Sequence, residues 1–196
     1  DDIVILTVKS QHTLGALEDL RAAAGDNVPI ICCQNGVANE AMALRRFNRV
    51  YAMAVYLPGE LLDPGEVRCH SIKKIGILDA GVYPHGTDDL ITEVAARLEK
   101  ANIVSVPTAN TMAWKYAKLV INTGNSLGAA FPKGTDTKAL RERLNAEAFA
   151  TFDAAGIDYK TLEEMRERRK GLMETGEIDG VGRAGGSTYQ SIANGK

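Results

Sequence analysis

Short apolar runs alternate with helical patterns over the first fifty residues. Ile3–Val8 is a continuous run of β-branched and aliphatic residues, and Pro29–Cys33 is a second short apolar run. Both are too short for helices. They are apolar on both faces, as strands of a covered parallel sheet should be. Between and after them, apolar residues recur at intervals of three and four, which predicts helices that run to Gly25 and through Phe47. This alternation predicts an α/β fold with a parallel sheet.

The pattern changes after Val50. Three short apolar segments separated by Pro and Gly turns predict antiparallel strands over 51–56, 65–70 and 74–78. A helix is predicted over 88–102 and a strand over 103–106, and from residue 112 the pattern is wholly helical, over 112–131, 138–155, 161–173 and 188–193. We therefore expect an α/β domain over residues 1–107 and an all-α domain over residues 108–196.

Composition and charge narrow the function classes. The chain has 196 residues, of which 45% are apolar and 24% charged, as in an ordinary globular protein. The chain has 23 Lys and Arg against 25 Asp and Glu, so it lacks the excess of positive charge that binding to nucleic acid or to an anionic membrane needs. No apolar run approaches the roughly 20 residues that span a bilayer. We expect a small-molecule partner, with no nucleic acid and no membrane.

The three cysteines predict a reducing compartment. Cys32 and Cys33 are adjacent inside an apolar run, and with Cys69 they make an odd number. We interpret them as buried free thiols, which favours a cytoplasmic protein. The histidines are scattered without ligand spacing to the cysteines, so no metal site is expected.

One motif is misleading. Residues 180–185 read Gly-Val-Gly-Arg-Ala-Gly, a literal match to the dinucleotide fingerprint. That fingerprint binds a pyrophosphate only where a strand leads into it and a helix follows, and no apolar strand precedes this copy. A flexible loop is the better interpretation.

A polar stripe on the predicted helix over 112–131 is more informative. Lys118, Asn122 and Asn125 are four and then three residues apart, so they share a face, with Trp114 one turn earlier. Asn is a mediocre helix former, and Gly124 costs about 1 kcal/mol relative to Ala. A solvated face that includes an extended lysine remains open, and spacing alone favours it.

Four blocks, taken together and in this order, resemble the ketopantoate reductase family, the NADPH-dependent 2-dehydropantoate 2-reductases. They are Val8-Lys9-Ser10, Gln34-Asn35-Gly36, Trp114 with 118–125, and 186–191. The resemblance runs the whole chain and implies a Rossmann-like domain, of which this sequence holds the second half, followed by a helical domain.

The resemblance implies a role for each polar residue on the substrate side. Lys118 would be the general acid, Asn122 and Asn125 would position the substrate, and Ser187 would contact its carboxylate. The chemistry agrees, because hydride transfer to a keto carbon leaves negative charge on oxygen. A nearby cation that can release a proton stabilises that charge and completes the alcohol.

The resemblance also places NADPH beside Lys9 and Asn35, and a 2-keto acid between the two domains. The family's Gly-rich turn and a basic residue near the adenosine phosphate would precede Asp1, and a family Glu would follow Lys196. We therefore expect a longer protein, and weak NADPH binding by this segment alone.

Several alternatives stay open. A β-hydroxyacid dehydrogenase also carries a catalytic Lys and Asn four residues apart, and a non-catalytic binding or dimerisation module would need neither. Taken residue by residue, Asn35-Gly36 could form only a turn and Ser187 only a helix N-cap. A homodimer is a further option that the sequence leaves undecided.

Overall fold

The computed structural model describes residues 2–61, 63–132, 134–182, 186–193 and 195. Its centre is a four-stranded sheet of order β1-β2-β3-β6, with β1 Val4–Leu6, β2 Ile30–Cys32, β3 Val50–Tyr56 and β6 Ile77–Val82. The first three strands are parallel, and β6 runs antiparallel to β3 with Tyr51 opposite Val82. The predicted α/β class and its change to antiparallel pairing are confirmed.

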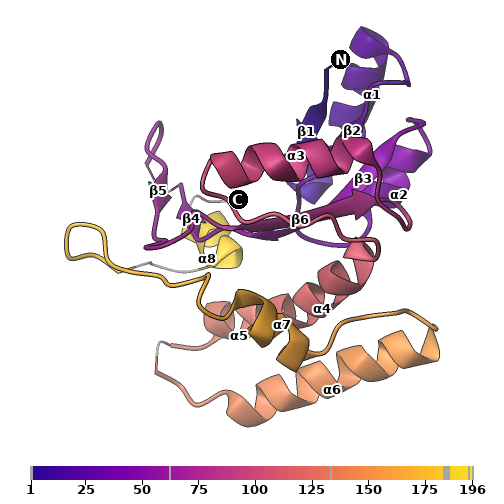
Figure 1. The fold of residues 1–196 in the computed structure, drawn as a ribbon. Helices are drawn as coiled ribbons and strands as arrows, with labels where there is room; N and C mark the ends of the chain where they lie inside the picture. Colours follow the sequence, from indigo (N-terminus) through magenta and orange to yellow (C-terminus); the bar gives the residue numbers. More distant parts are fainter. Residues whose placement is uncertain (1, 62, 133, 183–185, 194, 196) are drawn as a thin grey trace.

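Helices cover both faces of β2 and β3, which explains their continuous apolar sequences, whereas Ile5 of the edge strand β1 is exposed. The 3-10 turn η1 Ser10–His12 leads into α1 Thr13–Ala24, and α2 Asn39–Leu44 follows β2. Ile30 and Cys32 pack with residues of α1 and α2, whereas Ile31 packs with residues of α3 Asp89–Lys100. In Figure 1, α3 lies across the sheet on the side opposite α1 and α2.

A small hairpin extends from the end of β3. It consists of β4 Gly59–Glu60 and β5 Arg68–Cys69, paired antiparallel. His70 is buried beside it, and its ring lies 3.0 Å from Glu60 Oε2 and 3.2 Å from the Gly176 carbonyl oxygen. These contacts join the hairpin to the segment that leads toward the last helix.

Helices make up the second part of the chain. They are α4 Thr111–Thr123, α5 Asn125–Ala130, α6 Lys138–Ala154, α7 Leu162–Arg169 and α8 Ser187–Ala193, and the first four lie below the sheet in Figure 1. The Asn110 side chain caps α4, and Thr161 with Glu164 forms a capping box on α7.

Two contacts fasten these helices to the sheet. The α4 residue Ala117 packs in a core cluster with Ala54 of β3 and Ile77 of β6. The α7 residue Arg168 donates two hydrogen bonds, of 2.6 and 2.8 Å, to the carboxylate of the buried Asp79 on β6. The arrangement brings α4 onto the same end of the sheet as the loop after β2. A domain boundary at residue 107 stays a prediction.

Several predicted elements differ from the structure. The strands predicted over 65–70 and 74–78 are Arg68–Cys69 and Ile77–Val82. The predicted strand over 103–106 makes only isolated parallel bridges, from Val104 to Ile77 and from Pro107 to Ala80. Its Ser105 and Val106 N–H groups donate instead to the carboxylates of Glu99 and Asp79. The predicted helix over 112–131 is divided at Gly124 into α4 and α5, and the one over 161–173 ends at Arg169. Gly171 follows with φ +71°, a conformation that favours glycine.

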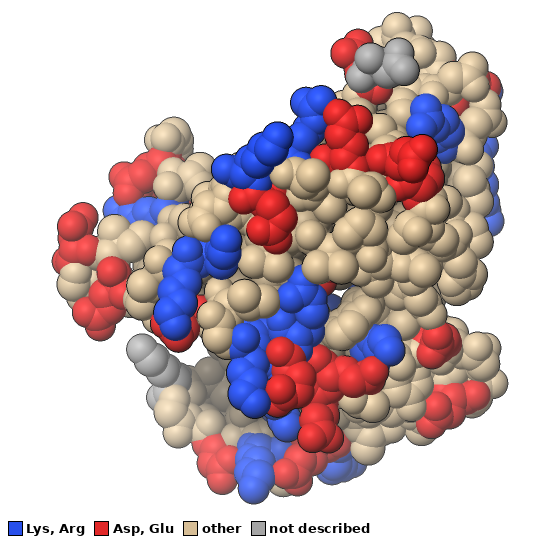
Figure 2. Space-filling model, in the orientation of Figure 1, with Lys and Arg blue, Asp and Glu red and all other residues tan. Residues whose placement is uncertain are grey.

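The free cysteines are not all buried. Cys32 is buried and Cys33 is half-buried, but Cys69 is exposed because it lies on the short edge strand β5. In the described part of the chain, no helix is both long and apolar enough to cross a membrane, and no group of three His, Cys, Asp or Glu side chains is placed to hold a metal. Acidic and basic side chains are interspersed on the face that Figure 2 shows.

Candidate active site

The loops that follow β1 and β2 are fastened to each other by Gln34. Its Nε2 donates to the Val8 carbonyl oxygen at 2.6 Å and to Thr13 Oγ1 at 2.9 Å, and Thr13 in turn donates to Asn39 Oδ1. Gly36 has φ +88°, so the turn after Asn35 needs glycine. Ligands of parallel α/β sheets bind outside the carboxyl ends of the strands, where these loops lie.

Lys118 extends from α4 toward the sheet. Its Nζ donates to the Val55 carbonyl oxygen and lies 4.8 Å from the centroid of the Tyr56 ring. The side chain is half-buried, and it lines a small cavity with Asn35, Asn122 and Val55. The amine therefore points into the junction between the sheet and the helices, which argues against the solvated-face alternative for this lysine.

That cavity is small but adjoins a larger one. The cavity at Lys118 has a volume of about 10 Å³, close to the space of one water molecule. A neighbouring cavity of about 440 Å³ is lined by Lys9, Ser10 and Thr188. Gln34, Asn35 and Val55 line both cavities. Asn35 thus stands between the space at Lys118 and the space at Lys9.

Lys9 lies on the far wall of the larger cavity. Its Nζ donates to Ser191 Oγ of α8 at 2.9 Å, and it is exposed. The Asn35 side chain is also exposed and makes no hydrogen bond within the described residues. Both polar groups are therefore accessible to a molecule that enters the cavity.

Asn125 does not line the cavity at Lys118. Asn125 is the first residue of α5, beyond the break at Gly124, and it lines a different cavity, of about 500 Å³, with Gly186 and Thr188. Ser187 begins α8, and its side chain lies outside the described part. Thr188, next to it, lines both this cavity and the one at Lys9, so α8 separates the two.

The sequence reasoning missed Lys115, one turn before Lys118. Its side chain is only 3% exposed and forms an ion pair with Glu40 of α2, whose side chain is fully buried. Lys115 Nζ also donates to the Gln34 carbonyl oxygen at 3.0 Å. A glutamate among alanines and methionines on a short helix was the available signal, since a buried carboxylate needs a partner.

Burial controls the titration of the other reactive groups nearby. It raises the pKa of the Cys32 thiol to about 12, with a further contribution from Glu40, and it raises the pKa of the Tyr56 hydroxyl to about 12. Burial also raises the pKa of Cys33, although Lys115 and Lys118 partly oppose it. These groups stay protonated at neutral pH, so none of them supplies a thiolate or phenolate nucleophile.

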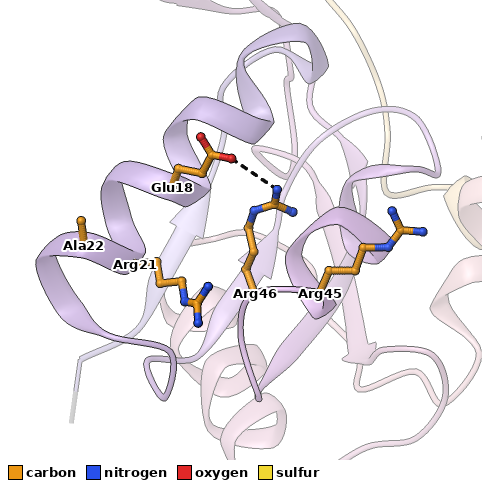
Figure 3. A pocket seen from close by; sticks show the side chains of 5 residues that line it. All are labelled: Glu18, Arg21, Ala22, Arg45 and Arg46. Carbon is orange, nitrogen blue, oxygen red and sulfur yellow. Dashed lines mark hydrogen bonds and ion pairs between the residues drawn. The ribbon is translucent and has the colours of Figure 1, made fainter.

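An arginine-lined cavity at the other end of the sheet has a structural explanation. Figure 3 shows Arg21, Arg45 and Arg46 with Glu18 in a cavity of about 600 Å³ between α1 and α2. Arg46 pairs with Glu18 at 3.3 Å and donates to the Met42 carbonyl oxygen. Arg21 lies in the last turn of α1 and Arg45 caps α2. Cations stabilise helix C-termini, so this cluster needs no ligand.

The sheet has three parallel strands and helices on both faces, and the helix α4 places a lysine at its carboxyl edge. This arrangement defines a Rossmann-type α/β protein with a helical part. Residues 2–81 match the family model of ketopantoate reductase PanE/ApbA. This match confirms the resemblance to that family that the sequence indicates.

Relatives extend the similarity over most of the chain. A 2-dehydropantoate 2-reductase of Pyrococcus horikoshii is 30% identical over 190 residues, which cover 88% of this chain and 62% of the relative. One of Aquifex aeolicus is 25% identical over 181 residues, 85% of this chain and 57% of that protein. The chain therefore spans about three-fifths of the length of these relatives.

Solved structures show the same fold. The PanE/ApbA family ketopantoate reductase from Ralstonia eutropha superposes with a TM-score of 0.74 at 25% identity, over 100% of this chain and 63% of that chain. A D-mandelate dehydrogenase, described in complex with NADH, gives a TM-score of 0.76 at 17% identity, over 98% of this chain and 66% of that chain.

Proposed function

We propose that the protein to which this chain belongs is an NADPH-dependent 2-dehydropantoate 2-reductase. The observation that carries the proposal is the position of Lys118, which reaches from α4 to the carboxyl edge of the sheet beside Asn35 and Asn122. The match to the family model supports the reaction class, and the names of the relatives support the substrate.

In this proposal Lys118 is the general acid. Its amine, now bonded to the Val55 carbonyl oxygen, would turn to the oxygen of the substrate keto group and donate a proton to it. The positive charge stabilises the oxyanion as it develops, and proton donation yields the alcohol. Asn122, one turn along the same helix, would hold the substrate, with Asn125 and Ser187 as further substrate contacts.

The cavity beside Lys9 and Asn35 suits a nucleotide cofactor. A reduced nicotinamide nucleotide supplies the hydride when bound. Lys9 offers a cation, Ser10 a hydroxyl and Asn35 an amide, all at the carboxyl ends of β1 and β2. We infer that NADPH rather than NADH is used and that these residues lie beside its nicotinamide half.

The test is NADPH oxidation, followed by absorbance, by the protein in the length that its gene encodes. We expect turnover with 2-dehydropantoate, and faster turnover with NADPH than with NADH. A panel of other 2-keto acids with NADPH, and of 3-hydroxy acids with NADP⁺ followed by NADPH formation, separates this activity from that of a β-hydroxyacid dehydrogenase. Absence of turnover with every 2-keto acid would refute the reductase proposal.

The location and assembly of the protein are also proposals. We propose a cytoplasmic protein, in keeping with its free cysteines. A solved ketopantoate reductase of Staphylococcus aureus is described as dimeric. A homodimer of this protein is the corresponding expectation, and light scattering of the purified protein checks it.

A further inference from the structure

An aromatic ring at the end of β3 lies beside the lysine of the proposed reaction. Tyr56 is the last residue of β3, and Lys118 Nζ lies 4.8 Å from the centroid of its ring. A cation within roughly 6 Å of an aromatic face is attracted to it, and the attraction is stronger where water is partly excluded. Tyr56 is buried and Lys118 is half-buried. The ring therefore attracts the ammonium group toward the carboxyl edge of the sheet.

The sheet and the helix α7 fix the position of this ring. The Tyr56 backbone pairs with Ile77 of β6, and both residues belong to one core cluster with Met165 of α7. Arg169, in the last turn of α7, faces the same ring with its guanidinium carbon 5.5 Å from the centroid. Its Nε donates to the Met165 carbonyl oxygen at 2.9 Å. Tyr56 is thus a fixed surface rather than an adaptable side chain.

The hydroxyl group does not explain why a tyrosine occupies this position. Tyr56 Oη is buried, and within the described part of the chain it has no hydrogen-bond partner. A buried hydroxyl without a partner costs stability. A leucine would fill a core position without that cost. What an aromatic residue adds over an aliphatic one is a ring face that attracts a cation.

We propose that Tyr56 is a positioning residue, whose ring keeps the Lys118 amine in place while the amine turns from the Val55 carbonyl oxygen to the substrate. The inference rests on the proposed function, because the ring matters to the reaction only if Lys118 is the general acid. A hydrogen bond to a carbonyl oxygen uses one N–H group in one direction, whereas attraction to a ring face acts on the whole charge. The ammonium can therefore turn without leaving the ring.

Two substitutions of Tyr56, in the protein of the length that its gene encodes, separate the ring from the hydroxyl. Tyr56→Leu removes the ring and should lower kcat for NADPH-dependent reduction of 2-dehydropantoate by roughly 2- to 30-fold, the worth of a cation–ring contact. KM for 2-dehydropantoate should change little, because the ring holds the lysine and not the substrate. Tyr56→Phe keeps the ring and should retain most of the wild-type kcat.

Tyr51→Leu is the matched control for the loss of a buried tyrosine. Tyr51 lies on the same strand, but its side chain belongs to the cluster that packs with α3. This variant should keep a kcat near that of the wild type. A loss of kcat in Tyr51→Leu equal to that in Tyr56→Leu would show a general effect of destabilising β3 and would overturn the inference.

The effect of the ring should act through Lys118. In the Lys118→Met enzyme, Tyr56→Leu should lower kcat no further, because no amine is left to hold. The same fold loss in both backgrounds would overturn the inference. Turnover that needs Lys118 but is unchanged in Tyr56→Leu would also overturn it, while the proposed function would stand. Absence of turnover in the wild type would overturn both.

Nuclear magnetic resonance of the wild type tests the contact even if Tyr56→Leu does not fold. The ε-methylene protons of Lys118 should resonate upfield of those of the exposed Lys138, because the ring current shields protons above an aromatic face. Loss of the signal in Lys118→Met assigns it. The shift should persist in Tyr56→Phe and vanish in Tyr56→Leu. A wild-type Lys118 signal at the position of Lys138 would overturn the inference.

Discussion

Two lysines one turn apart on α4 show how differently the same side chain can be used. Lys115 is buried with its charge met by Glu40 and by the Gln34 carbonyl oxygen. Lys118 is half-buried, bonded to the Val55 carbonyl oxygen and close to the Tyr56 ring. The first is paired with a buried carboxylate within the fold, whereas the second lines a cavity.

This difference separates a structural role from a chemical one. Removing one partner of a buried ion pair leaves the other charged and unsolvated, so Lys115 is tied to the stability of the fold. A half-buried cation beside a cavity can exchange its contacts for a substrate oxygen at lower cost. We therefore expect substitutions at the two positions to act on different measured quantities.

The largest expected effect is on the rate of the proposed reaction. Lys118→Met should lower kcat for NADPH-dependent reduction of 2-dehydropantoate by roughly 10²- to 10⁴-fold, the usual contribution of a general acid. Its melting temperature should stay near that of Lys138→Met, an exposed lysine variant on α6. A Lys118→Met enzyme with normal turnover would remove the chemical role.

The second-largest expected effect is the loss of folding stability when Lys115 is replaced. Lys115→Met should lower the free energy of unfolding by about 3–5 kcal/mol, because Glu40 would remain buried without its cation. Urea denaturation measures this change, and Lys118→Met is the matched control on the same helix. If the two variants lose equal stability, the contrast between the lysines is wrong.

A double variant sharpens the same contrast. Replacing the pair together, by Lys115→Met with Glu40→Met, should recover most of the stability that Lys115→Met loses. Well-packed apolar residues often replace a buried ion pair at little net cost. The Oε2 atom of Glu40, which has no hydrogen-bond partner in the described residues, also favours recovery. A double variant as unstable as the single one would show that Lys115 acts through other contacts.

The sequence predicts the elements of this fold better than it predicts the pairing of charges. Continuous apolar runs identify β2 and β3 because both faces of the sheet are covered. Spacing along one helix finds Lys118 and Asn122, which share a cavity. These signals are local, and they fix which residues share a strand or a helix face.

The remaining contacts join residues far apart in the sequence. Glu40 and Lys115 are 75 residues apart, and Asp79 and Arg168 are 89 apart. Asn125 shares a helix face with Lys118 only while the helix is regular. Local spacing does not show the break at Gly124, where the Arg141 side chain of α6 lies close by.

The smallest expected effect is on the exposed ion pair of Lys160 and Glu164, which contrasts with the buried pair of Lys115 and Glu40. Hydrogen bonds from Lys160 and from the Thr161 backbone lower the pKa of Glu164 from 4.5 to about 2. This stabilisation is fully present above pH 4.5 and is lost as the pH falls from 4.5 toward 2. Because the pair is exposed to solvent, Glu164→Gln should cost no more than about 1 kcal/mol at pH 7.

Urea denaturation of the wild type and of Glu164→Gln at pH 7, 4 and 3 measures this dependence. The difference between the two proteins should be greatest at pH 7 and should shrink at pH 4 and again at pH 3. Lys115→Met should show a loss several times larger at pH 7, since solvent does not screen its partner. Equal losses for the exposed and the buried pair would mean that burial does not set the strength of these contacts.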